Sequence, residues 1–150
     1  MTLTWTCLAF ERLSAAELYR ILQRRNEVFV VEQHCVFQDA DGKDPLAWHL
    51  CGWQEAELLA YARLLAPGDY YPEAAIGRVL SAPSHRGHGL GRALMQEALS
   101  RCRSLFGPGP LRIGAQQHLS AFYGSLGFLA DGVPYMEDGI PHIEMLLNLY

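Results

Sequence analysis

The sequence has no apolar run near the length of a membrane span, no paired cysteines and no leader-like start. Its four cysteines, at positions 7, 35, 51 and 102, include no Cys-x-x-Cys pair, so neither a zinc knuckle nor a redox motif is encoded. No apolar run approaches the roughly 20 residues that cross a bilayer, and no basic segment precedes an apolar one at the start of the chain. We therefore expect a cytoplasmic protein with reduced thiols, no metal and no contact with a membrane.

Charge is also scarce, and neither sign is concentrated. Charged residues make up 19% of the chain, the formal net charge is −4, and the arginines are scattered rather than clustered. These values argue against a nucleic-acid partner. With 150 residues, 50% of them hydrophobic, the composition is that of one globular domain over residues 1–150. The sequence leaves the oligomeric state open, with a homodimer as one option.

Hydrophobic periodicity predicts a succession of strands and helices along the chain. The expected strands cover residues 2–10, 47–54, 57–66, 74–81, 111–115, 128–133 and 143–149. The expected helices cover about 14–31, 90–106 and 119–126, and Ser14 with Glu17 gives the first one a capping-box pattern. The order β-α-β-β-β-α-β-α-β-β indicates an α/β fold with a sheet of mixed direction.

A glycine-rich bend between the strand at 74–81 and the following helix is the most informative segment. Glycines at 87, 89 and 91 leave the backbone N–H groups open to a bound group, and the positive end of the helix faces the same way. Such a bend suits a phosphate or pyrophosphate. Gly91 is followed by Arg92 and Ala93 rather than Lys and Ser or Thr, which argues against a P-loop. The G-x-G-x-G spacing also differs from the G-x-G-x-x-G of dinucleotide-binding folds.

Two motifs in this chain resemble the GNAT acyltransferase superfamily. The segment Arg86-Gly-His-Gly-Leu-Gly91 is similar to its R-x-x-G-x-G loop, and Ala121-Phe-Tyr-Gly-Ser-Leu-Gly-Phe128 is similar to its second signature. The segments 26–33, 41–44 and 140–142 resemble the ElaA-like branch. The resemblance covers most of the chain and implies a mixed, mostly antiparallel central sheet flanked by helices. It also implies acetyl-coenzyme A as co-substrate and a small-molecule or protein amine as acceptor.

The resemblance assigns residues to the coenzyme site and one to catalysis. Backbone groups of Val79, Leu80 and Ser81 would bind the pantetheine arm, with one of their amides as oxyanion donor. Gln116 stands seven residues before the tyrosine, where many members have Asn, and its amide would reach the same arm. Tyr123 would be the general acid for the departing thiolate. The pyrophosphate would be held by Arg86, Gly87, His88, Gly89, Leu90 and Gly91, with Arg92 adding positive charge.

The general base that takes the proton of the acceptor ammonium is less defined by the sequence. Glu32 and His142 are the leading candidates, and a water chain is an alternative to a single residue. The other acidic candidates are Glu27, Asp41, Asp44, Glu137 and Asp138. Arg63 and Arg78 lie inside apolar strands, where each would hold a substrate carboxylate or pair with a nearby acid.

Two further functions compete with an N-acetyltransferase. The first is a non-catalytic module that binds coenzyme A or acyl-coenzyme A as a sensor, which would have no need of an acid at Tyr123. The second is a nucleotide-binding protein, which the residues after Gly91 disfavour. No cysteine occupies a motif position typical of an acyl carrier, so direct transfer is the expected route.

Overall fold

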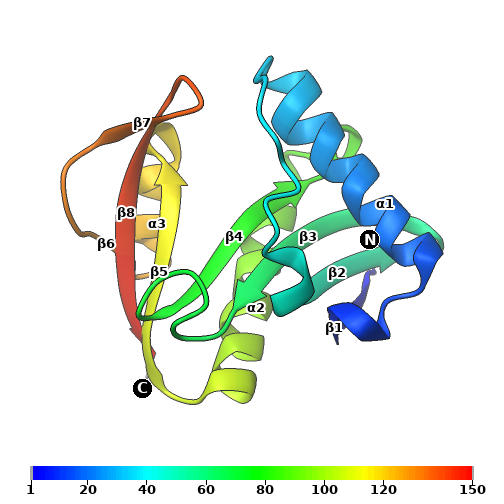
Figure 1. Ribbon diagram of the computed structural model, residues 1–150, viewed down its shortest axis with the longest axis horizontal. Helices are drawn as coiled ribbons and strands as arrows, with labels where there is room; N and C mark the ends of the chain where they lie inside the picture. The colour runs from blue at the N-terminus through cyan, green and yellow to red at the C-terminus, as the bar shows by residue number, and fades with distance from the viewer. Residues whose placement is uncertain (1, 150) are drawn as a thin grey trace.

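A twisted sheet of eight strands runs through the molecule, with helices on both faces (Figure 1). The computed structural model describes residues 2–149. The strands are β1 Thr4–Ala9, β2 Trp48–Gln54, β3 Glu57–Leu65, β4 Ala74–Ser81, β5 Gly109–Gln116, β6 Leu129–Ala130, β7 Tyr135–Glu137 and β8 Ile140–Leu149. Their order is β1-β2-β3-β4-β5-β8-β6, with β7 also paired to β8. Among these strands only β4 and β5 pair in parallel, so the predicted mixed, mostly antiparallel sheet is confirmed.

The helices fall where the periodicity predicts them, with one change of type. They are α1 Ala15–Arg25, α2 Leu90–Phe106 and α3 Ser120–Ser125, and α1 continues as a π-helical segment, η2, over Asn26–Glu32. The predicted capping box at the start of α1 is present, because Ser14 Oγ accepts from the Glu17 N–H and the Glu17 carboxylate accepts from the Ser14 N–H. Short 3₁₀ turns occupy Phe10–Arg12 (η1), Asp44–Leu46 (η3), Pro83–His85 (η4) and Gln117–Leu119 (η5).

Two apolar cores lie on opposite faces of the sheet. Residues of α1 and η2, such as Ile21 and Val28, pack with Leu58 and Tyr61 of β3. On the other face, Leu94 and other residues of α2 pack against Leu50 of β2 and Leu59 of β3, in a core that also includes residues of β4 and β5. Neighbouring residues of β3 thus serve different cores, because successive side chains of a strand point to opposite faces. The central strand β3 is buried from Leu58 to Leu65, which explains its continuous apolar sequence.

The C-terminal segment departs from the prediction. The strand expected over 128–133 is reduced to two residues in β6, and a hairpin of β7 and β8 follows it. Asp138 and Gly139 form the hairpin turn, with φ angles of 51° and 77°. Positive φ at both turn residues is the feature of the type I′ turn, for which Asp-Gly is a preferred pair. The hairpin puts Glu137 at the end of β7 and His142 in β8, whereas the sequence predicted loops for both.

A bulge in β4 lies in the part of this strand that is not paired with β5. Tyr61 of β3 lies opposite Leu80, but Arg63 lies opposite Gly77, so β4 carries one extra residue between these pairs. Arg78 adopts the left-handed region there, with φ of 51°. β4 pairs with β5 only through Ala74 and Ala75, and beyond them the two strands diverge (Figure 1). A bulge bends its strand and ends local pairing, and here it accompanies an opening between β4 and β5.

Candidate active site

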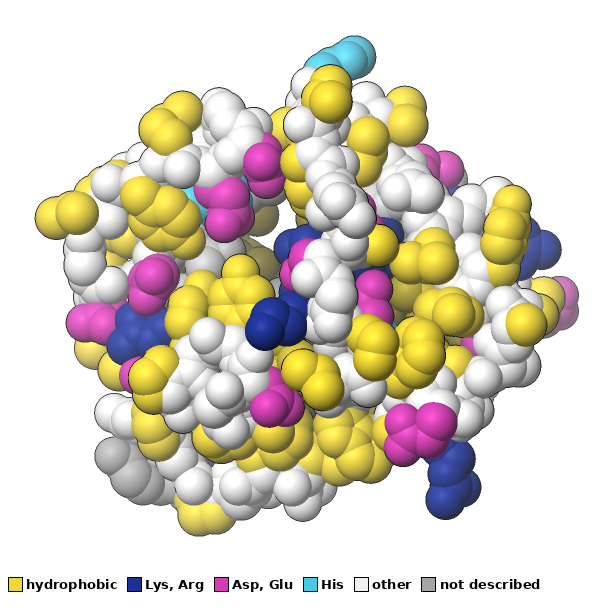
Figure 2. Space-filling view, in the orientation of Figure 1, with side chains coloured by type: hydrophobic (Ala, Val, Ile, Leu, Met, Phe, Trp, Pro, Cys, Tyr) yellow, Lys and Arg dark blue, Asp and Glu magenta, His cyan; other side chains and the backbone are white. Residues whose placement is uncertain are grey.

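The opening between β4 and β5 leads into a cavity of about 540 Å³. Its walls come from β4, β5, η2, α3 and the β7–β8 hairpin, elements far apart in the sequence. Figure 2 shows the cavity as a hollow between the surface over β5 and β8 and the surface over α1 and the loop 33–46. A cavity of this volume is in the range of sites that bind small molecules.

The β4 edge of the cavity presents backbone N–H groups without a strand partner. The Ala82 N–H donates to the Leu59 carbonyl at 2.7 Å, so it points toward β3. Successive N–H groups of a strand point to opposite edges, which turns those of Ser81 and Val79 toward the opening. All three residues predicted to bind pantetheine, Val79, Leu80 and Ser81, line the cavity. This geometry agrees with backbone binding of an extended arm.

The glycine bend presents backbone groups that suit an anion. Gly87 and Gly89 have φ angles of 86° and 75°, conformations that side chains rarely adopt, and their positions face open space. Gly89 precedes α2, and the first N–H with a partner within the helix is that of Ala93, which donates to the Gly89 carbonyl at 3.1 Å. The preceding N–H groups at the start of α2 therefore have no intrahelical acceptor. They suit a phosphate at the helix N-terminus.

The side chains of this bend differ in what they offer to a ligand. Leu90 is buried in the core, so only its backbone is available, whereas His88 is exposed. Arg92 donates to the Ser125 hydroxyl at 2.7 Å, and its guanidinium lies 5.7 Å from the ring centre of Phe122. Arg92 therefore joins the start of α2 to α3 and keeps its positive charge beside the helix N-terminus.

Arg86 is held by an acid from the opposite wall. Its two terminal nitrogens donate to the two carboxylate oxygens of Glu32, each at 2.8 Å. The hydrogen bonds from Arg86 lower the pKa of Glu32. A carboxylate whose proton affinity is reduced in this way is a weaker base, so the geometry disfavours Glu32 for proton removal. The sequence did not predict this pair, because its members are 54 residues apart.

Tyr123 lines the cavity from α3 and is only 6% exposed. Burial raises the pKa of its hydroxyl to about 12. The rings of Phe122 and Phe128 hold it edge-on, with centroid distances of 5.1 and 6.0 Å. Within residues 2–149 its hydroxyl has no hydrogen-bond partner, although it is not sealed from the cavity. Tyr123 is thus a protonated donor without a protein acceptor.

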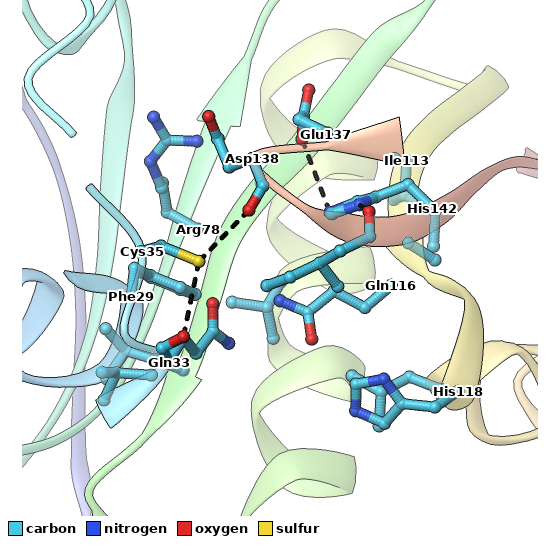
Figure 3. Close-up of a pocket in the computed structure, with 18 of the residues that line it drawn as sticks. Phe29, Gln33, Cys35, Arg78, Ile113, Gln116, His118, Glu137, Asp138 and His142 are labelled. Atoms are coloured by element: carbon cyan, nitrogen blue, oxygen red, sulfur yellow. Dashed lines mark hydrogen bonds and ion pairs between the residues drawn. The ribbon is translucent and has the colours of Figure 1, made fainter. Parts of the chain in front are cut away.

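His142 faces the cavity from β8, opposite Gln116 of β5 in the strand register. Its Nδ1 lies 2.7 Å from the Ile140 carbonyl, which can only accept, so Nδ1 carries a hydrogen. Nε2 lies 3.4 Å from a carboxylate oxygen of Glu137 (Figure 3). The ring also stacks on Tyr135. In the neutral ring Nε2 is free to accept a proton, and the resulting cation would lie beside Glu137.

Arg63 and Arg78 belong to a buried ionic cluster. Arg63 donates to Asp41 at 2.8 and 2.9 Å and to Asp44 at 3.0 Å, and Arg78 donates to the Asp39 carboxylate at 2.8 Å. Of the two interpretations that the sequence allowed, pairing with nearby acids is the one seen. Only Arg78 also lines the cavity.

Arg25 completes the cluster from α1. It is fully buried and donates to Asp39 at 2.8 Å and Asp44 at 2.7 Å. The cluster fastens the loop 33–46 to α1, β3 and the bulge of β4. That loop and the end of η2 contribute Gln33, Cys35 and Phe37 to the cavity wall, none of which the sequence singled out.

Two possible features are absent from the described residues. Over residues 2–149, no group of three or more His, Cys, Asp or Glu side chains is arranged to hold a metal ion. In the same range, no helix combines the length and apolar character needed to cross a membrane.

Comparison with known proteins points to one family. The model of the acetyltransferase (GNAT) domain matches residues 47–149. Protein ElaA of Escherichia coli is 44% identical over 143 residues, which covers 94% of each chain.

Solved structures agree with this match. The crystal structure of an acyl-CoA N-acyltransferase from Pseudomonas aeruginosa superposes with a TM-score of 0.93 at 46% identity, covering 97% of this chain and 99% of the other. Escherichia coli ElaA superposes with a TM-score of 0.91 at 42% identity, covering the same shares.

Proposed function

Because this chain belongs to the GNAT acetyltransferase family and has the fold of coenzyme A-dependent acyltransferases, we propose that it moves an acetyl group from acetyl-coenzyme A directly to a primary amine. The observation that carries the proposal is the position of Tyr123. Tyr123 lines the same cavity as the open edge of β4 and the start of α2, and among residues 2–149 its hydroxyl has no hydrogen-bond partner. A donor in that position is suited to protonate a leaving group, which a site for binding alone does not require.

The residues present fit the donor. Val79 and Ser81 offer N–H groups at the open edge of β4, and the left-handed Gly87 and Gly89 leave room over the start of α2. Gln116 projects into the cavity from β5 (Figure 3). When bound, acetyl-coenzyme A supplies an acyl group activated as a thioester. The backbone N–H groups would hold its amides and its pyrophosphate.

Negative charge develops on the acyl oxygen as the amine attacks. A backbone N–H of β4 that points into the cavity is suited to stabilise this charge, because it is fixed before the reaction begins. The bulge at Arg78 contributes indirectly, since it bends β4 in the part of the strand that is not paired with β5. Arg78 is therefore a positioning residue in this proposal.

The acceptor arrives as an ammonium with a pKa near 10, and it must lose a proton before it can attack. His142 Nε2 is the group best placed to accept this proton, and Glu137 at 3.4 Å would stabilise the cation. Glu32 is a poorer candidate because Arg86 occupies both of its oxygens.

The proposed step is balanced by three proton movements. The amine nitrogen forms a bond to the acyl carbon, and the bond from that carbon to sulfur breaks. His142 holds the proton taken from the ammonium, and Tyr123 donates its proton to the departing sulfur. The attacking nitrogen still carries one proton more than an amide, and this proton restores the Tyr123 hydroxyl. The products are an acetamide and the free thiol of coenzyme A, and His142 releases one proton to water.

The test is turnover of acetyl-coenzyme A with a panel of primary amines, followed by free-thiol release and by mass spectrometry of the product. We expect an acetylated amine in amounts equal to the thiol. Coenzyme binding without turnover of any amine would contradict the proposal and support the sensor function instead. A product formed from longer acyl-coenzymes but not from acetyl-coenzyme A would contradict the acetyl assignment alone.

A further inference from the structure

The tip of the β7–β8 hairpin brings two carboxylates to the mouth of the cavity. Glu137 and Asp138 both line it, on either side of the point where β7 ends and the turn begins. Asp138 and Gly139, which form the turn, have the left-handed φ values of a type I′ turn. Figure 2 shows acidic side chains on this border of the hollow, beside a histidine.

The hairpin tip is tied to the opposite wall. The Cys35 thiol donates to the Asp138 carbonyl at 3.4 Å and contacts the Gln33 carbonyl at 3.5 Å (Figure 3). Cys35 is buried and follows η2, so this contact joins the N-terminal and C-terminal halves across the cavity.

The charges around this end of the cavity are not balanced. Within residues 2–149 the Asp138 carboxylate has no cationic partner, and Glu137 has only His142. Arg78, on the facing wall, is already committed to Asp39 through its Nε at 2.8 Å and through an Nη at 3.1 Å. The uncompensated charge at the hairpin end of the cavity is therefore negative.

A second, independent feature marks where the reacting end of a ligand would lie. Tyr123 is only 6% exposed, and in the part of the chain from 2 to 149 its hydroxyl has no hydrogen-bond partner. The cavity thus has one neutral donor at depth and two acids at its border. Phe29 of η2 and Phe37 of the loop 33–46 add apolar side chains to the cavity wall.

We propose that the acceptor is a small diamine or polyamine, whose second ammonium is held by Asp138 while the first loses its proton at His142, beside Glu137. This inference rests on the proposed function and specifies its substrate class. A monoamine would gain nothing from Asp138. An amino acid would bring a carboxylate toward the two acids, where like charges repel.

The experiment compares α,ω-diamines of increasing length with monoamines of equal carbon number, amino acids and a lysine-containing peptide. We expect kcat/KM to be about ten-fold higher for the best diamine than for its matched monoamine. Equal values for the two, or preference for the amino acids or the peptide, would overturn the inference and leave the proposed function standing. Coenzyme binding with no turnover of any acceptor would overturn both.

Asp138→Asn is the decisive variant, because Asn tolerates the left-handed conformation and the backbone carbonyl that Cys35 contacts is retained. We expect KM for the diamine to rise about five-fold with kcat nearly unchanged, and KM for the monoamine to stay constant. Glu55→Gln is the matched control, since Glu55 also lies in a turn with positive φ, 56°, but outside the cavity. An equal loss for both amines in Asp138→Asn would refute the assigned contact.

The dependence of KM on ionic strength tests the same contact in the unaltered protein, so it needs no folded variant. Screening weakens the attraction between the second ammonium and Asp138. For the unaltered protein, KM for the diamine should rise with added salt more steeply than KM for the monoamine. Parallel salt dependence of the two KM values would contradict the proposal.

Discussion

The pair of Glu32 with Arg86 allows the roles of both residues to be tested by one nearly isosteric change, Glu32→Gln. Both carboxylate oxygens accept from Arg86 at 2.8 Å, yet the two side chains are 39% and 43% exposed. An ion pair that is this exposed contributes about 0.2–1 kcal/mol. Neutralising Glu32 would release Arg86 to the pyrophosphate and remove a like charge, so coenzyme affinity should rise about two- to five-fold.

Calorimetric titration with coenzyme A measures this change, and steady-state kinetics on the same variant measures kcat. We expect kcat to change little, because His142 rather than Glu32 is the proposed base. Glu97→Gln serves as control, since Glu97 forms a similarly exposed pair with Arg101 on α2. Weaker coenzyme binding would show that Glu32 orients Arg86 for the ligand. A fall of kcat by about 100-fold or more would identify Glu32 as the base.

Three further changes test the loop and the ionic cluster. Gly89→Ala places a Cβ on a residue with φ of 75°, which strains the backbone of the bend by about 1–2 kcal/mol. Coenzyme binding, measured by titration, should therefore weaken. Unchanged affinity would refute the need for this bend. Arg25→Met removes one donor from each of two buried carboxylates, Asp39 and Asp44, which keep Arg78 and Arg63 as their respective partners. Urea denaturation should show a loss of about 3 kcal/mol, whereas a loss below 1 kcal/mol would contradict the assigned pairing. For Asp41, burial raises the pKa, but the hydrogen bonds from Arg63 and a backbone N–H outweigh it and give about 2. Because this folded-state pKa lies below the ordinary 3.8, the stability it confers is complete above about pH 4 and lost as the pH falls toward about 2. Asp41→Asn should flatten acid unfolding in that window by about 1 kcal/mol after screening, and an unchanged slope would refute the pairing.

Local patterns made much of the fold predictable. The capping box of Ser14 and Glu17 and the glycines of the bend act within a few residues, so their signals are complete in the sequence. The buried β3 was also evident as an apolar run of strand length. The Asp138-Gly139 pair carried the signal for the missed hairpin, but neighbouring residues gave a weak alternation pattern.

The contacts that shape the cavity were not predictable in this way. Arg25 pairs with Asp39 and Asp44 across 14 and 19 residues, and Cys35 reaches Asp138 across 103. A single sequence shows that a buried arginine needs an acid, but not which one. The bulge at Arg78 likewise depends on its pairing with β3. The proposed roles of Tyr123, His142 and the coenzyme loop remain predictions that the geometry supports.

The most direct test of the central claim is the rate of amine-dependent thiol release from acetyl-coenzyme A by the protein and by Tyr123→Phe, with coenzyme affinity measured on both. Removing the hydroxyl alone keeps the ring packing against Phe122 and Phe128. We predict that kcat falls by about 100- to 10,000-fold while coenzyme affinity stays within about two-fold. Thiol release that persists at the original rate in Tyr123→Phe would show that the hydroxyl does not protonate the departing thiolate.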